Sequence, residues 1–270
     1  MTLDLAGEES ALRGRREAYA RVTVVWARSP VSARAGDAAL VTVDGRLQGW
    51  VGGSCTEPVV VRQALEALAE GRPRLLHLAP PDELPPAREG MVSVPVTCQS
   101  EGSVEVFIEP RPPRPRLVVV GRSPLVEALA TMAGAIDFEV LVVERDAAPP
   151  LGLADAGGIA DLDLVGAGVG ADAFVVVATM GRYDEDALEA ALATGARYVA
   201  LVASERRAAA VRAVLGAAGV AEEDLARVRS PAGLDLGDLP HPELAVAILA
   251  EIVAEKAAGG PPPVPASGAG

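Results

Sequence analysis

The chain has 270 residues, of which half are apolar and only 3% aromatic, and its formal net charge is −13. That length can hold two domains, and the negative charge argues against binding to nucleic acid or to an anionic membrane surface. No apolar run is long enough for a membrane-spanning helix and no basic-then-apolar leader is present, so we expect a cytoplasmic protein without membrane insertion. Its two cysteines form no disulfide framework, and we expect free thiols.

Residues 18–110 are predicted to form a small α+β domain that follows a loose lead-in or short helix at residues 1–17. Apolar and β-branched runs predict its strands, which are 21–27, 38–43, 47–51, 74–78, 92–98 and 103–109. The last two of these strands are expected to pair as a hairpin.

A proline-rich linker at residues 111–115 is the predicted domain boundary, because prolines stiffen an extended chain. Beyond it, the predicted elements alternate: strands at 116–120, 138–143, 174–178 and 198–202 and helices at 125–134, 184–194, 205–218 and 243–254. Such alternation is typical of the α/β class, so residues 116–256 are predicted to form a Rossmann-like domain with a doubly wound parallel sheet. Residues 257–270 are expected to be a disordered tail.

The stretch around Cys55 joins a predicted strand to a predicted helix over the following pattern, which starts at Val59 and has Gly71 just past its end. Gly52 and Gly53 permit a tight turn before it, and Thr56 is a candidate N-cap. Core-facing positions of the helix are predicted from the spacing of Val61, Leu65 and Leu68. Two interpretations of Cys55 stay open: a reactive or ligating thiolate, whose pKa the helix start would lower, or a small buried residue in a turn.

The start of the second domain has part of a dinucleotide-binding pattern. Gly121 follows the first strand in the first glycine position, and Glu144 ends the second strand, where an acid normally meets a ribose. Ser123 and Val126 replace the second and third glycines, which normally allow close approach of a pyrophosphate and close helix packing. The pattern therefore predicts the fold, while NAD(P) binding is one alternative and a module without a nucleotide is another.

Several blocks of the sequence resemble the XdhC/CoxI family of xanthine dehydrogenase accessory proteins. The resemblance spans residues 19 to 254 and rests on Val41-Thr-Val-Asp-Gly-Arg46, Trp50-Val-Gly-Gly-Ser-Cys-Thr-Glu57, Pro95-Val-Thr-Cys-Gln-Ser100, the entry to the Rossmann-like domain at 118–130, Ser230-Pro-Ala-Gly-Leu-Asp-Leu-Gly237 and the helix at 245–253. It implies a maturation factor for molybdenum hydroxylases, and not a hydroxylase itself.

The resemblance further implies a chaperone that binds the molybdenum cofactor transiently, protects it during sulfuration and helps to load it into a xanthine or carbon monoxide dehydrogenase-type enzyme. The implied partners are an apo molybdenum hydroxylase, a cysteine desulfurase and a second copy in a homodimer. Cys55 and Cys98 are the candidate soft contacts to molybdenum or sulfur. The other candidate cofactor-binding residues in the N-terminal domain are Gly52, Gly53, Ser54, Glu57, Arg28 and Arg34.

The alternative from a different functional class is an NAD(P)-binding oxidoreductase or a nucleotide-sensing regulator. Its candidate binding residues are Gly121, Ser123 and Glu144 in the Rossmann-like domain. The incomplete glycine pattern argues against this alternative, as does the lack of a histidine or lysine placed to donate a proton there.

Overall fold

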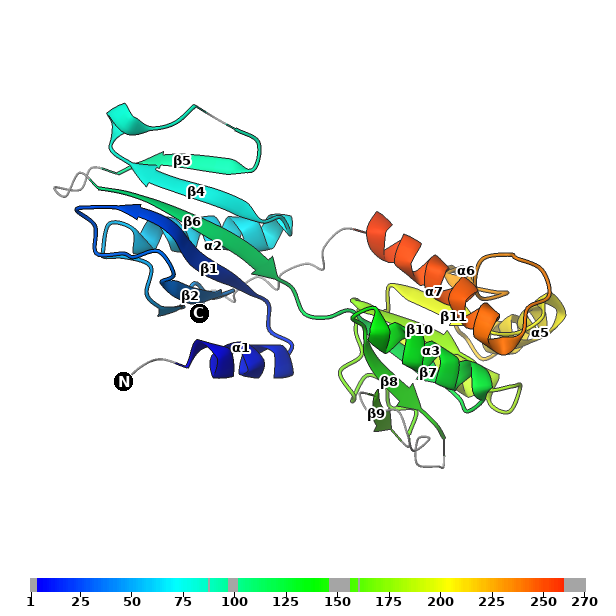
Figure 1. Ribbon diagram of the computed structural model, residues 1–270. Helices are drawn as coiled ribbons and strands as arrows, with labels where there is room; N and C mark the ends of the chain where they lie inside the picture. Colours follow the sequence, from blue (N-terminus) through cyan, green and yellow to red (C-terminus); the bar gives the residue numbers. More distant parts are fainter. Residues whose placement is uncertain (1–3, 87, 97–101, 146–155, 160, 260–270) are drawn as a thin grey trace. The chain divides into compact units, whose positions relative to one another are not determined.

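The computed structural model describes residues 4–86, 88–96, 102–145, 156–159 and 161–259 (Figure 1). These residues divide into two compact units, one ending at Pro113 and the other running from Arg114 to Gly259. Cys98 and the end of the predicted tail lie outside the described residues. Within them, no helix combines the length and apolar character needed to cross a bilayer.

The first unit is an α+β fold built on one sheet. Its elements in chain order are α1 (Leu5–Gly14), β1 (Tyr19–Arg28), β2 (Ala38–Thr42), β3 (Leu47–Gly49), α2 (Glu57–Glu70), β4 (Arg74–Ala79), the 3-10 helix η1 (Pro81–Glu83), β5 (Met91–Pro95) and β6 (Ser103–Arg111). The described strands form a sheet in the order β3-β2-β1-β6-β4-β5. Helix α2 packs across the middle of one face, mainly on β6 and β1 (Figure 1).

Helix α2 buries Leu68 as predicted, but the rest of its buried stripe differs from the predicted one. Val60 and Ala64 are fully buried in the core of the first unit, whereas Val61 and Leu65 are half-buried. The latter two side chains lie over the β2–β3 turn, because a Cβ added at Gly45 would meet them at 3.6 and 3.8 Å. The helical period was predicted correctly, and the stripe is rotated by one residue because the hairpin turn also needs covering.

The predicted hairpin between the last two strands of the first unit is wrong. β5 pairs in parallel with β4, and β4 lies between β5 and β6. The other edge of β6 pairs with β1 over nearly its whole length, so β6 has no free edge for β5. β6 also continues to Arg111, opposite Tyr19, so the sheet includes the first residue of the predicted linker.

The predicted lead-in contains a helix, α1, that is packed on the sheet. Asp4 caps the helix by accepting a hydrogen bond from the Gly7 N–H at 3.0 Å. Leu12 is fully buried against Tyr19 and Leu40, which lie on β1 and β2. The helix therefore belongs to the core of the first unit.

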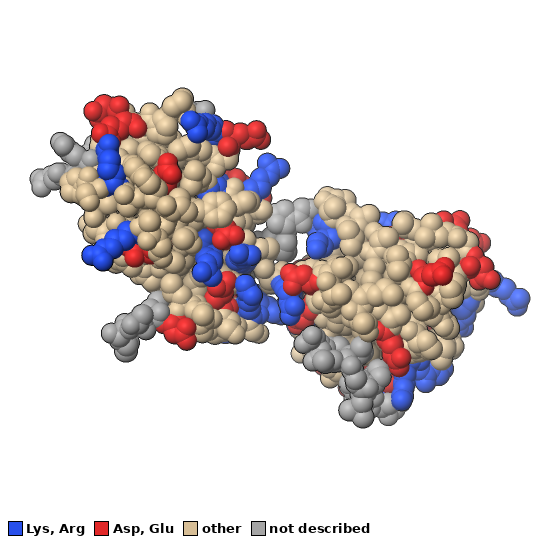
Figure 2. All heavy atoms as spheres, viewed as in Figure 1, with Lys and Arg blue, Asp and Glu red and all other residues tan. Residues whose placement is uncertain are grey.

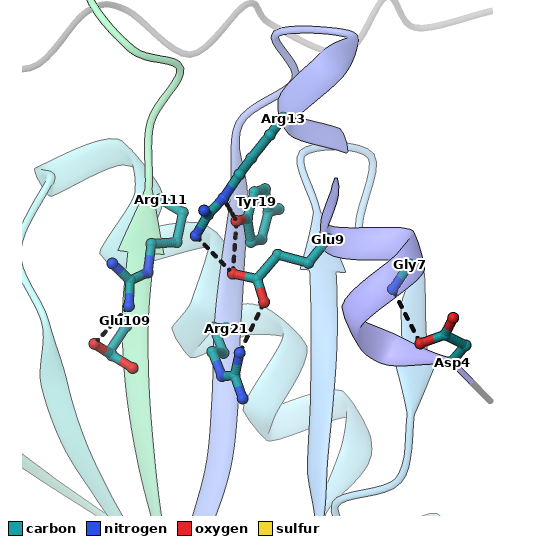
Figure 3. A network of polar contacts seen from close by, with 8 residues as sticks. All are labelled: Asp4, Gly7, Glu9, Arg13, Tyr19, Arg21, Glu109 and Arg111. Atoms are coloured by element: carbon teal, nitrogen blue, oxygen red, sulfur yellow. Dashed lines mark hydrogen bonds and ion pairs between the residues drawn. The ribbon is translucent and has the colours of Figure 1, made fainter. Parts of the chain in front are cut away.

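A network around Glu9 fixes α1 to β1 (Figure 3). Its Oε1 accepts hydrogen bonds from the Tyr19 hydroxyl at 2.8 Å and from Arg13 at 3.1 Å, and its Oε2 accepts one from Arg21 at 2.7 Å. Burial alone would raise the pKa of Glu9, but the Tyr19 hydrogen bond and the charges of Arg21, Arg13 and Arg111 outweigh it. The pKa of Glu9 is therefore lowered in the folded protein.

We expect Glu9→Gln to lower the free energy of unfolding at pH 7 by about 1–3 kcal/mol, because the variant loses charge-assisted hydrogen bonds. A carboxylate whose pKa is lowered on folding stabilises above its unfolded pKa, near 4.5, and this stabilisation disappears as the pH falls further. The difference from wild type should therefore shrink below about pH 4.5. Urea unfolding followed by tryptophan fluorescence measures it. Glu17→Gln removes an exposed ion pair with Arg15 and serves as the control, so equal losses for both variants would contradict the prediction.

The second unit has the predicted Rossmann-like fold. Its elements in chain order are β7 (Arg116–Val120), α3 (Pro124–Ala135), β8 (Glu139–Val143), β9 (Ala156–Ile159), β10 (Ala173–Val177), α4 (Asp184–Ala193), β11 (Tyr198–Leu201), α5 (Glu205–Ala217), α6 (Glu222–Ala226), β12 (Val228–Arg229) and α7 (His241–Ala258). All described strand pairs are parallel, in the order β12-β11-β10-β7-β8-β9. Counted from β7, this is the 3-2-1-4-5-6 order of dinucleotide-binding folds, which confirms the α/β prediction.

Two hydrophobic layers cover the second sheet. One contains residues of α4 and α5, including Leu188 and Val211, and the other contains residues of α3 and α7, including Leu129 and Ile248. Acidic and basic side chains are interspersed on the face of both units shown in Figure 2. On that face, the net negative charge is therefore not gathered into one acidic surface.

Candidate functional site

The segments that contain the predicted N-terminal site lie at one end of the first sheet. β1 ends there at Arg28, which pairs with Ser103 at the start of β6. β4 and β5 are parallel to each other and antiparallel to β6, so both end there too. β3 ends on the same side, since its last residue pairs with the beginning of β2, and it leads into the turn with Cys55. Cys98 follows β5 in the chain but lies outside the described residues.

The turn before α2 depends on Gly52. This residue has φ +126°, a left-handed conformation that side chains with a Cβ resist. The Gly53 carbonyl accepts hydrogen bonds from the N–H groups of Thr56 and Glu57 at 2.9 and 3.1 Å. Thr56 occupies the N-cap position without a side-chain capping bond, contrary to the prediction, because its own backbone is already helical at φ −86° and ψ −45°.

Cys55 is an exposed, free thiol in this turn. Exposure rules out the interpretation of Cys55 as a small buried core residue. Ser54 and Glu57 are exposed as well, and Glu57 lies in the first turn of α2, where a negative charge favours the helix dipole. Gly53 is beside the Ser32 hydroxyl, which a Cβ would meet at 3.5 Å. The thiol can therefore contact a ligand without unfolding of the turn.

We expect Gly52→Ala to cost about 1–3 kcal/mol of stability, because alanine at φ +126° is strained. An added Cβ would also approach the Thr56 side chain to 3.1 Å. Gly53→Ala is the matched control, since its Cβ would make only an ordinary contact and its φ is not positive. Urea unfolding monitored by the fluorescence of nearby Trp50 measures both. If Gly53→Ala lowered the free energy of unfolding as much as Gly52→Ala does, the positive φ of Gly52 would not be the reason that this turn requires glycine.

The two candidate arginines differ in their contacts. Arg28 forms an ion pair with Glu83, and its Nη2 donates to Ser103 Oγ at 3.1 Å. The Arg34 side chain is exposed and has no ion pair among the described residues, while its backbone N–H donates to Asp37 Oδ2 at 2.7 Å. Arg34 is therefore the less neutralised of the two positive charges and the better anion contact.

The segment after Cys98 also meets this loop. A Cβ added at Gly102 would lie 2.6 Å from Pro30 O and 2.8 Å from Arg28 O, so the two backbones are in close contact. The loop that begins at Arg28 thus lies against Gly102 on one side and against Gly53, through Ser32, on the other. This loop therefore lies between the Cys55 turn and Gly102, the first described residue after Cys98.

A row of side chains that the sequence reasoning missed lies on the sheet face opposite α2. Trp26 on β1 pairs with Glu105 on β6, which pairs with His77 on β4. His77 Nδ1 is 3.0 Å from Glu105 Oε1, and the rings of Trp26 and His77 are stacked with centroids 6.4 Å apart. No sequence motif marks this row, because its three members come from distant parts of the chain.

The carboxyl ends of β7 and β10 form the switch point of the second sheet. Gly121 has φ +127°, and a Cβ there would overlap the Ala178 carbonyl and lie 3.0 Å from Thr179 N. Ser123 caps α3, because its Oγ accepts from the Val126 N–H at 3.3 Å. Pro124, next in the chain, has no N–H. The start of α3 therefore has fewer free donors for a pyrophosphate than an ordinary dinucleotide site.

Glu144 is buried, with 2% of its surface exposed, directly after β8. Its Oε1 accepts from Arg182 at 3.4 Å, and its Oε2 has no hydrogen-bond partner among the described residues. Tyr183 lies beside it, and the pKa of this hydroxyl is raised first by burial and also by the charge of Glu144. Such an acceptor at the end of the second strand suits a ligand hydroxyl or N–H group.

Two family models match the chain. Residues 117–252 match the XdhC Rossmann domain, and residues 12–79 match the XdhC and CoxI family. The first match covers the second unit from β7 into α7, and the second runs from the last turn of α1 to the end of β4 and includes Cys55.

Known proteins that are similar to the chain include a curated relative and a solved structure. The protein YqeB of Escherichia coli (strain K12), described as uncharacterized, is 33% identical over 224 residues, which is 80% of this chain and 40% of YqeB. The chain thus spans less than half of that relative's length. A crystal structure described as a xanthine dehydrogenase from Bacillus halodurans aligns with a TM-score of 0.45 and 17% identity, over 92% of this chain and 94% of that one.

Proposed function

Because the chain belongs to the XdhC and CoxI family of xanthine dehydrogenase accessory proteins, we propose that it binds the molybdenum cofactor as a transient cargo. It protects this cargo and helps to deliver it to a xanthine or carbon monoxide dehydrogenase-type hydroxylase. The observation that carries the proposal is the exposed thiol of Cys55, presented by a glycine turn at the start of α2. An exposed thiol on a rigid turn suits a soft, sulfur-rich metal centre.

The groups around Cys55 have chemically distinct roles in this proposal. The Cys55 sulfur contacts molybdenum or its terminal sulfur. Arg34, with no ion pair among the described residues, contacts the phosphate of the cofactor. Cys98 remains a proposed second soft contact, in a segment whose described flank at Gly102 lies on the same loop as Arg28.

The proposal also covers the partners. A cysteine desulfurase supplies the terminal sulfur, an apo molybdenum hydroxylase receives the finished cofactor, and the protein works as a homodimer. In this scheme the protein itself holds and shields the cargo and performs no turnover of its own. Membership of the XdhC and CoxI family supports the hydroxylase partner.

Anaerobic purification from a molybdenum-replete host tests the proposal. Metal and pterin analysis should find molybdenum and pterin in near-equal amounts bound to the full chain. A protein that carries neither group, purified beside an apo hydroxylase that still acquires its cofactor, would contradict the cargo role.

Glu144 favours a second candidate function, nucleotide or nucleoside binding by the Rossmann-like unit. Its buried Oε2 lacks a partner among the described residues and lies where dinucleotide-binding folds hold a ribose. Thermal unfolding with NAD(P) and with adenosine tests this candidate: a raised Tm without turnover favours a sensor, and turnover favours an oxidoreductase. No shift with either ligand would exclude both.

A further inference from the structure

Both tryptophans of this protein are exposed, although its aromatic content is low. Trp26 is 42% exposed and Trp50 is 48% exposed. The phenylalanine and tyrosine side chains, by contrast, are buried or half-buried. Single exposed apolar side chains are common on protein surfaces, so exposure alone assigns a role to neither ring.

Trp26 has a carboxylate beside it. β6 alternates, so that Val104 and Val106 face the core under α2 while Glu105 faces the other side. Trp26 pairs directly with Glu105, and cross-strand partners hold their side chains about 4.5–5.5 Å apart at Cβ. The Glu105 side chain is 30% exposed, so a ligand that stacks on the Trp26 ring can reach it.

His77 holds this carboxylate in place. Its Nδ1 lies 3.0 Å from Glu105 Oε1, and His77 itself is buried. Each carboxylate oxygen has two acceptor positions, so one contact to Oε1 leaves Oε2 able to accept from a ligand. The Trp26 and His77 rings are nearly parallel, at 17°, on either side of Glu105. Together they set an aromatic surface next to an oriented acceptor.

We propose that Trp26 and Glu105 form a subsite for a 2-amino-4-oxopyrimidine ring, the ring shared by pterins and guanine. Such a ring is planar, so it can stack on the indole, and its edge carries adjacent ring and amino N–H donors that a carboxylate can accept. The choice of a pterin as the occupant rests on the proposed cofactor-binding function, whereas the geometry requires only the ring.

Arg28 places a positive charge next to this subsite. It follows Trp26 by two residues on β1 and pairs with Ser103, the residue two before Glu105 on β6. Its guanidinium is 46% exposed, although it is partly neutralised by Glu83. This charge lies at the sheet end where β1 stops and β6 begins, so it is available to an acidic substituent on a ring held by Trp26 and Glu105.

Equilibrium dialysis of the full-length protein against free pterin, and separately against guanosine, tests the subsite. Trp26→Ala and Glu105→Gln should each weaken pterin binding at least about tenfold. Trp50→Ala, which removes a similarly exposed tryptophan outside the β1–β6 strand pair, should bind as wild type. Thermal unfolding of each variant confirms that the fold is intact.

The outcomes separate this inference from the cofactor-binding function. The subsite is overturned if Trp26→Ala binds pterin as tightly as wild type. It is also overturned if Trp50→Ala weakens pterin binding as much as Trp26→Ala does. Either result holds even if molybdenum still co-purifies with the protein. Tighter binding of guanosine than of pterin supports the ring subsite and assigns it to a nucleotide. Pterin binding that depends on Trp26 supports the subsite even if the purified protein carries no molybdenum.

Discussion

Cys55→Ser is expected to reduce molybdenum co-purifying with the protein at least about tenfold, because a hydroxyl is a poor ligand for a soft metal centre. The fold should be unaffected. The Cys55 side chain is exposed, so its replacement removes no core contact and leaves no cavity. Anaerobic purification followed by metal and pterin analysis of wild type and variant measures the effect.

A second variant at this position distinguishes loss of the metal-ligating sulfur from a change in side-chain polarity. Cys55→Ala should lose molybdenum to the same extent as Cys55→Ser, and both should unfold at the same temperature as wild type. Retention of molybdenum by both variants would place the metal contact elsewhere. A lowered Tm that accompanies the loss would mean that Cys55 supports the turn itself.

Gly121→Ala is expected to destabilise the Rossmann-like unit by about 2–6 kcal/mol. Backbone strain contributes to this loss, and so does overlap with the carboxyl end of β10, the neighbouring strand in the sheet. The strain comes from φ +127°, and the overlap involves the Ala178 carbonyl, which is backbone and cannot rotate away. A loss of this size approaches the whole stability of a typical domain. Urea unfolding followed by far-UV circular dichroism should show one unit unfolding early.

Gly181→Ala is the matched control for this prediction. Gly181 follows β10, has φ +81°, and would place its Cβ in open space. The Gly181→Ala variant therefore has backbone strain without overlap, and we expect its free energy of unfolding to fall by about 1–2 kcal/mol. If Gly121→Ala lowered the free energy of unfolding no more than Gly181→Ala, the close contact with the Ala178 carbonyl would not explain why glycine is required at position 121.

The Rossmann-like unit was predictable because its signals are local. A parallel strand buried on both faces, such as β7 or β10, is a continuous apolar run that stands out between helices. The elements that the prediction missed have no such run: β9 is Ala-Gly-Gly-Ile and β12 contains only two residues. Each becomes a strand through its neighbour in the sheet, which the sequence of the segment does not reveal.

The first unit was harder to predict because its pairing is not local. Residues 92–98 and 103–109 have the composition of a hairpin, yet β4 intervenes between the two strands. The position of Cys55 could be predicted, since a strand, a glycine turn and a helix follow one another in the chain. The row of Trp26, Glu105 and His77 could not, because alternation predicts which face a residue takes and not which residue lies opposite.

The central place of β6 also has a consequence for how the first unit is made. β6 is the last strand of its sheet in the chain, and it alone joins β3-β2-β1 to β4-β5 among the described strands. During synthesis these two groups of strands leave the ribosome before the strand that connects them. We therefore expect slow folding, governed by long-range contacts, and a nascent chain that ends before Ser103 should hold two unconnected halves with exposed edges.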